Sequence, residues 1–144
     1  MVRLLVKSKK EHYTADACVV WCYDNRFWKA FQNLLEDQKI KYFDPIFIAG
    51  GSKSIASPDD ESERNFVLKQ IELSIKLHNA SHIILMNHSD CGGYGGLKFS
   101  SEEEEYLFHK KELEEARKVV QERFPKIRVK AIFVGFEEIW FLDE

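Results

Sequence analysis

The chain has 144 residues, of which 44% are hydrophobic and 13% aromatic, which is enough for one well-buried core and too little for two ordinary domains. We therefore expect one domain over residues 1–144. Lys and Arg total 21 against 24 Asp and Glu, so the net charge of −3 supplies no basic surface for nucleic acid or an anionic membrane.

The sequence predicts neither a membrane-spanning helix nor a signal peptide. No stretch approaches the roughly 18 apolar residues of a membrane-spanning helix. The start, "MVRLLVKSKK", has only the apolar run "LLV", where a signal peptide needs about 7 to 15 such residues. These features predict a cytoplasmic protein whose partner is a small molecule.

The first predicted elements are a strand, a helix and a second strand. "ACVVW" at 17–21 and "PIFIA" at 45–49 are short and apolar, as strands buried on both faces tend to be. Between them, "RFWKAFQNLLEDQKI" at 26–40 predicts a helix. Three of its apolar residues recur at helical spacing and are expected to face the core, namely Phe31, Leu34 and Leu35.

A second helix is predicted over 57–78, with Ser57 as its N-cap and Pro58 at its first position. The residues expected along one of its faces are Phe66, Val67, Ile71, Ile75 and His78. The strand "HIILM" at 82–86 follows.

A third helix is expected to begin at Ser101, which has capping-box spacing to Glu104, and to stop at Pro125. Its core-facing stripe is Leu113, Ala116, Val120 and Phe124.

The last core strand is predicted at 129–134, in "VKAIFV". The tail "FEEIWFLDE" adds one more strand or leaves Trp140 and Phe141 as interface surface. Strands that alternate with helices predict an α/β fold in three layers, with a mainly parallel sheet of four to five strands and helices on both faces.

Chemistry-bearing residues follow two of the predicted strands. Cys22, Asp24 and Arg26 come directly after the first strand, and His88 and Cys91 after the third. Because ligands gather outside the carboxyl ends of parallel strands, the five side chains converge if these strands are neighbours.

Two thiolates and one imidazole suit Zn²⁺ and leave a fourth position, which Asp24 could fill or stand beside. Alternatively, His88 is a satisfied interior imidazole and Cys91 a small buried hydrophobe. Three cysteines also argue against a disulfide framework.

Competing motifs fail on spacing. The chain has neither the His-x-Glu and Pro-Cys-x-x-Cys of a zinc deaminase nor the Cys-x-x-Cys of a thioredoxin-like site. "IAGGSKS" at 48–54 is only loosely similar to a phosphate-binding loop.

Two of these motifs together resemble those of a known enzyme family. "CYDNR" at 22–26 together with "HSDCGG" at 88–93 resembles the Cys-x-Asp-x-Arg and His-x-x-Cys-Gly-Gly pair of the β-class carbonic anhydrases. The resemblance implies reversible hydration of CO₂ to bicarbonate by a zinc lyase (carbonate dehydratase). The zinc ligands it implies are Cys22, His88 and Cys91.

The same resemblance implies roles beside the metal. Asp24 would accept a hydrogen bond from the zinc-bound water, and Arg26 would orient Asp24. Gly92 and Gly93 would let backbone N–H groups approach a bound anion, although a plain turn between strand and helix explains them as well.

The chain also departs from the family. Only 21 residues precede Cys22, so the long helical arm with which many members embrace a partner subunit is expected to be absent or reduced. We still expect a homodimer or higher homo-oligomer, formed through a sheet edge or the Trp140–Phe141 tail. Leu73 stands where members often have Tyr, and "FIAGGSK" replaces a common Arg-Asn-Ala-Gly-Asn stretch.

These departures keep two other functions open. One is hydrolysis of a sulfur analogue of CO₂, carbonyl sulfide or carbon disulfide, in an apolar pocket that Leu73 would help to form. The other is a noncatalytic zinc-stabilised binding module.

The remaining histidines and cysteine have ordinary expectations. Cys18 should be core. His78 and His82 should lie at the amino edge of the sheet, opposite the proposed site. His12 and His109 should be solvated.

Overall fold

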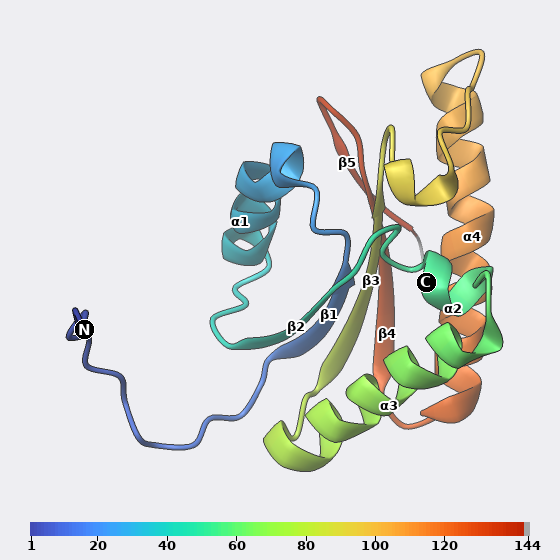
Figure 1. The fold of residues 1–144 in the computed structure, drawn as a ribbon. Helices are drawn as coiled ribbons and strands as arrows, with labels where there is room; N and C mark the ends of the chain where they lie inside the picture. Colours follow the sequence, from blue (N-terminus) through green and yellow to red (C-terminus); the bar gives the residue numbers. More distant parts are fainter. Residues whose placement is uncertain (143–144) are drawn as a thin grey trace.

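The computed structural model describes residues 1–142, which form one five-stranded sheet covered by helices on both faces (Figure 1). The strand order is β2-β1-β3-β4-β5, and all strands but the last are parallel. The strands are β1 Ala17–Trp21, β2 Phe43–Phe47, β3 His82–His88, β4 Arg128–Val134 and β5 Ile139–Phe141. The predicted three-layer α/β fold is confirmed, and the tail supplies the additional strand, antiparallel to β4.

The two faces of the sheet have different covers. Ala17, Val19 and Trp21 of β1 pack against helix α1 (Trp28–Asp37), mainly through Phe31 and Leu34. The alternate residues of the strands face the other side, because successive side chains of a strand point to opposite faces.

That second face is covered by three helices: the short α2 (Lys53–Ala56), α3 (Glu61–His78) and α4 (Glu102–Arg123). Cys18 lies in this core, fully buried as expected. Burial raises the pKa of its thiol to about 12, so it is an inert core residue.

Strand β2 corrects one prediction. It spans 43–47 rather than 45–49, and it is an edge strand with partly exposed residues rather than one buried on both faces. Pro45 lies at its centre and has no N–H to donate to a further strand, a feature typical of sheet edges.

Helix α3 begins later than the sequence suggests. Its N-cap is Asp60, whose side chain accepts a hydrogen bond from the Ser62 N–H, so Ser57 and Pro58 lie in the loop before it. Phe66, expected on the core face, is 61% exposed, while Val67 and Ile71 are buried. The earlier Ser-Pro pair follows α2 instead.

Helix α4 begins as predicted. Ser101 is its N-cap, and its hydroxyl accepts a hydrogen bond from the Glu104 N–H. The helix ends at Arg123, two residues before Pro125.

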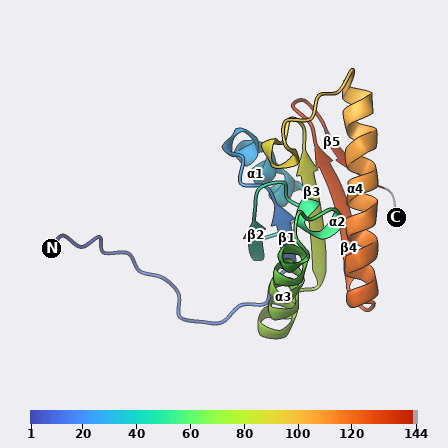
Figure 2. The ribbon, with the colours of Figure 1, turned by 45° about the vertical axis from the view of Figure 1, so that its right-hand side comes forward.

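Residues 1–14 contain no helix or strand and extend away from the sheet (Figure 2). Tyr13 ties this segment to the body, because its hydroxyl donates to Asp44 Oδ1 over 2.5 Å. Within residues 1–142, no helix combines the length and apolar character needed to cross a bilayer.

Candidate metal centre

The carboxyl ends of β1 and β3, which are neighbours in the sheet, bring three metal-ligating side chains together. One ligand atom from each of Cys22, His88 and Cys91 lies within 4.8 Å of the other two. All three residues are buried. The convergence expected from the strand ends is therefore present, and Cys18 is not part of the cluster.

His88 is held in the tautomer that a metal needs. Its Nδ1 lies 2.6 Å from the Ser89 carbonyl oxygen, to which it donates, so the lone pair is on Nε2. Among the described residues, Nε2 of His88 is the one side-chain nitrogen or oxygen that is fully shielded from solvent and has no hydrogen-bond partner. A satisfied interior imidazole would not leave this atom without a partner. The alternative that His88 is only a hydrogen-bonded core residue is therefore excluded.

The two thiols are poised unequally. A hydrogen bond from Cys91 is the largest effect on Cys22 and lowers its pKa, helped by the backbone N–H groups of Gly50 and Asp24. The same hydrogen bond, in which Cys91 is the donor, raises the pKa of Cys91, and burial and repulsion by the Cys22 thiolate raise it further. A cation between the sulfurs would remove this repulsion.

The donor set fits zinc. Two sulfur atoms and one imidazole nitrogen with a free lone pair are the ligands that borderline-soft Zn²⁺ prefers, and three protein ligands leave one position open. The partnerless Nε2 of His88 is the observation that makes this fit more than a matter of composition.

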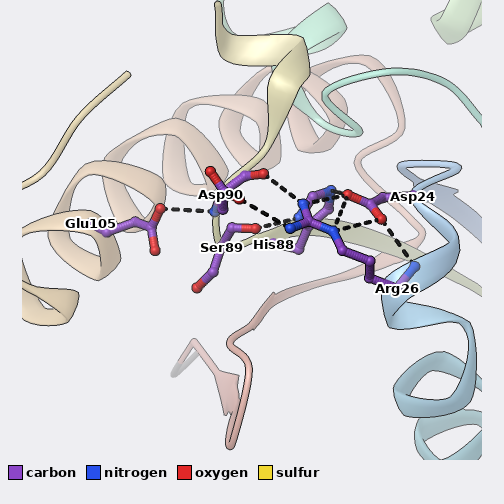
Figure 3. Close-up of polar contacts among 6 residues, drawn as sticks. All are labelled: Asp24, Arg26, His88, Ser89, Asp90 and Glu105. Atoms are coloured by element: carbon purple, nitrogen blue, oxygen red, sulfur yellow. Dashed lines mark hydrogen bonds and ion pairs between the residues drawn. The ribbon is translucent and has the colours of Figure 1, made fainter. Parts of the chain in front are cut away.

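Asp24 and Arg26 form a pair beside this cluster (Figure 3). Nε of Arg26 lies 3.1 Å from each carboxylate oxygen of Asp24, and Nη2 lies 2.7 Å from Oδ2. Arg26 holds the pKa of Asp24 below its usual value. Oδ2 of Asp24 is 3.9 Å from the free Nε2 of His88, so the carboxylate borders the open side of the cluster.

Asp90 is a partner that the sequence did not reveal. Its carboxylate and its carbonyl each accept a hydrogen bond of 3.0 Å from Arg26. Asp90 itself has a left-handed backbone (φ 51°), and its N–H donates to Glu105 of α4. Arg26 is thus held from two sides, and its orientation depends on the loop between His88 and Cys91.

Glycines allow two loops to meet over the cysteines. A Cβ on Gly93 would lie 2.4 Å from the nitrogen of Gly50, so only glycine permits this approach. The Gly50 N–H then reaches both sulfur atoms, where it favours the thiolate forms. The loose phosphate-loop pattern at 48–54 is therefore a loop that supports the cysteines.

Gly92 and Gly93 begin the 3₁₀-helix η2 (Gly92–Tyr94). A Cβ on Gly92 would meet nothing within 4 Å. The structure thus gives Gly93 a packing reason, and an anion-binding role for the pair stays a prediction.

His109 corrects another prediction. The sequence predicts a solvated imidazole, but His109 is fully buried beneath the site, where its ring stacks on Phe133. The Asn87 amide lies 3.2 Å from His109 Nδ1 and 2.8 Å from the Tyr94 hydroxyl, and its oxygen accepts from the Ser52 N–H. An Asn directly before His88 was the available signal for this network.

The role of Leu73 in a substrate pocket stays a prediction. A cavity of about 600 Å³ lies behind the Gly50 loop and reaches Gly93. The α3 residues that line it are Ser62, Glu63, Phe66 and Val67, and Leu73 is not among the described residues that do. His78 and His82, as expected, lie at the other edge of the sheet, where His78 is paired with Asp44.

Comparison with known proteins gives a consistent result. A family model described as "Putative carbonic anhydrase" matches residues 12–140. An uncharacterized protein of Rickettsia bellii is 27% identical over 143 residues, covering 93% of this chain and 87% of the relative.

Solved structures agree in fold. The β-carbonic anhydrase isoform I of Trichomonas vaginalis superposes with a TM-score of 0.59 at 17% identity, covering 96% of this chain and 87% of that one. A carbon disulfide hydrolase in its apo form superposes with a TM-score of 0.50 at 18% identity, covering 87% and 77% of the two chains. At these identities the likeness is one of fold, while the family model spans both the cysteines and the histidine. The chain belongs to the carbonic anhydrase family that this model describes, and it has the β-class fold.

Proposed function

We propose that the protein catalyses the reversible hydration of CO₂ to bicarbonate with zinc held by Cys22, His88 and Cys91. The observation that carries the proposal is the buried, partnerless Nε2 of His88, enclosed with two thiols beside a carboxylate that an arginine holds in place. The family match supports it.

When bound, zinc would act as a Lewis acid that lowers the pKa of a coordinated water toward neutrality and so supplies a nucleophile for an electrophilic carbon. The residues of the chain would orient this nucleophile. Asp24, kept ionised by Arg26, is an acceptor only and can hold one proton of the nucleophile in a fixed direction.

Arg26 is a positioning residue in this scheme. Its guanidinium binds both oxygens of Asp24 and both acceptors of Asp90, which restrains the carboxylate on the side of the cluster. Because two of the three protein ligands are thiolates, the metal they hold would be a weaker Lewis acid than in an all-histidine site. We therefore expect activity to rise toward alkaline pH.

Hydrolysis of a sulfur analogue is the second candidate. A carbon disulfide hydrolase shares the fold. A noncatalytic zinc module is the third candidate, and the same measurement tests it.

Stopped-flow CO₂ hydration by zinc-loaded protein is the deciding experiment, with carbonyl sulfide as second substrate. We expect CO₂ hydration well above the buffer rate and its loss, together with most of the zinc, in Cys22→Ser and Cys91→Ser. The core variant Cys18→Ser is the control and should keep its metal. Turnover of carbonyl sulfide alone would favour the second candidate, full zinc without either activity the third, and full zinc in both site variants would refute the ligand assignment.

A further inference from the structure

A second cavity, of about 470 Å³, lies between the first turns of α4 and the β4–β5 hairpin. It reaches Ser89, the residue after His88, and contains none of the proposed zinc ligands. Four of its lining residues are aromatic, namely Tyr106, Phe133, Phe136 and Trp140. The rings of Tyr106 and Trp140 lie 4.9 Å apart, so these two form a continuous aromatic wall.

The charge around this cavity is negative. Its acidic lining residues are Glu102, Glu103, Glu137 and Glu138, and no lysine or arginine is among the described residues that line it. Within residues 1–142, none of these four carboxylates takes part in an ion pair. They are all exposed.

Two positive features nearby are too weak to reverse this balance. The N-terminus of α4 contributes the equivalent of roughly half a positive charge, against four carboxylates. The guanidinium of Arg26 lies 5.6 Å from the Phe136 ring, but it is already paired with Asp24 and Asp90. An anion such as bicarbonate would therefore be repelled from the cavity.

Ser89 provides a polar group inside the cavity. The residue is only 7% exposed, its N–H donates to Val134, and its carbonyl accepts from His88. Its hydroxyl has no hydrogen-bond partner among residues 1–142. The hydroxyl oxygen lies beside Gly135, another lining residue, since a Cβ built on that glycine would be 3.8 Å from it. Figure 3 shows the hydroxyl pointing away from Asp24 and Arg26.

We propose that this cavity binds a small organic cation that carries N–H groups, an alkylammonium. The aromatic rings offer cation–π contact and apolar cover for the carbon chain. The glutamates attract the charge, and the Ser89 hydroxyl accepts an N–H that would otherwise need water. The volume is within the range of ordinary small-molecule pockets.

Three probes of similar size and different charge test the proposal: butylammonium, butyrate and butanol. Each is titrated into the full chain by calorimetry, with and without zinc, because the inference does not depend on catalysis. We expect saturable binding of butylammonium and none of butyrate. Equal binding of butanol would show a merely apolar cavity, and the absence of saturable butylammonium binding would refute the site.

Variants locate the site. Ser89→Ala should weaken butylammonium binding about tenfold, the loss expected for a hydrogen bond to a charged group, and Glu137→Gln with Glu138→Gln should weaken it without touching the core. Trp140→Leu should lower the affinity as well, whereas Trp28→Leu, which changes an exposed tryptophan of α1, should not. An unchanged affinity in Ser89→Ala and in the double glutamine variant would overturn the assignment.

Discussion

At the scale of single residues, Asp24 is placed so that two outcomes compete. Its carboxylate is close enough to the cluster to reach a metal, with Oδ2 3.9 Å from His88 Nε2, and it is also bound by Arg26 through three hydrogen bonds between side chains. Arg26 is about half exposed and would be a weak partner in isolation. Asp90 restrains it from the opposite side, which makes the pair more rigid than an ordinary surface ion pair.

We predict that Arg26→Ala keeps its zinc but loses activity by roughly 10- to 100-fold, the usual cost of removing a group that orients a metal site. Without its partner, Asp24 is free to take the fourth ligand position. Zinc content, hydration rate and zinc-edge X-ray absorption should be measured together. Lys29→Ala, an exposed basic residue in the first turn of α1, is the matched control.

Asp24→Ala should also keep its zinc, since three ligands remain, and should retain a solvent ligand with low activity. An Arg26→Ala protein with an unchanged rate and an unchanged absorption edge would show that the pair is only a surface contact, worth at most about 1 kcal/mol.

At the scale of elements, helix α4 supports the site through its buried residue His109. Burial, and to a smaller extent the nearby His88, lowers the pKa of His109 from 6.5 to about 4. The folded protein therefore keeps this ring neutral at pH values where the unfolded chain binds a proton. Stability contributed by the neutral ring is complete above pH 6.5 and is lost progressively as the pH falls toward 4.

This linkage gives a prediction for metal-free protein. Acidification from neutral pH should lower the free energy of unfolding, and His109 should account for up to about 3 kcal/mol of that loss. His109→Phe keeps a ring against Phe133 and removes the titration, so its stability should fall less with pH. Urea unfolding at both ends of this pH range measures the difference.

His12→Phe is the control, because His12 is exposed and should leave the pH dependence as it is. Identical acid sensitivity in His109→Phe and the parent protein would show that other groups cause the loss.

At the scale of the whole molecule, the sheet has two open edges with unequal capacity to pair. β2 carries Pro45 at its outer edge, which removes a donor. β5 at the other edge has no proline, and Phe141 on it is 48% exposed. Leu4, Leu5 and Val6 of the extended N-terminal segment add more exposed apolar surface, which is common at sites of association.

We therefore predict a homodimer or higher homo-oligomer that pairs through β5. Light scattering at high protein concentration should report more than one chain per particle, and Phe141→Glu should shift the population toward monomer. Phe47→Glu on β2 is the matched control and should leave the assembly intact. A parent protein that stays monomeric at high concentration would contradict the prediction.

The sequence by itself determined the parts of this protein that depend on local pattern and on residue chemistry. Apolar runs and helical spacing predicted the α/β layers, and the Ser101 cap predicted the start of α4, because these signals act within a few residues. The donor types Cys22, His88 and Cys91 indicated zinc, and the rule that parallel strands end at a common edge brought them together.

Only the tertiary structure decided which partners these residues meet. Contacts between distant segments decide the exposure of β2, the burial of His109, the hydrogen bonds between Asp90 and Arg26, and the approach of the Gly50 N–H to both cysteines. Local spacing carries no information on such contacts, because strand order and loop packing are set by the burial of the whole core. The same reason explains why Ser57 and Pro58, a plausible helix start in isolation, lie outside α3 once α2 has formed before them.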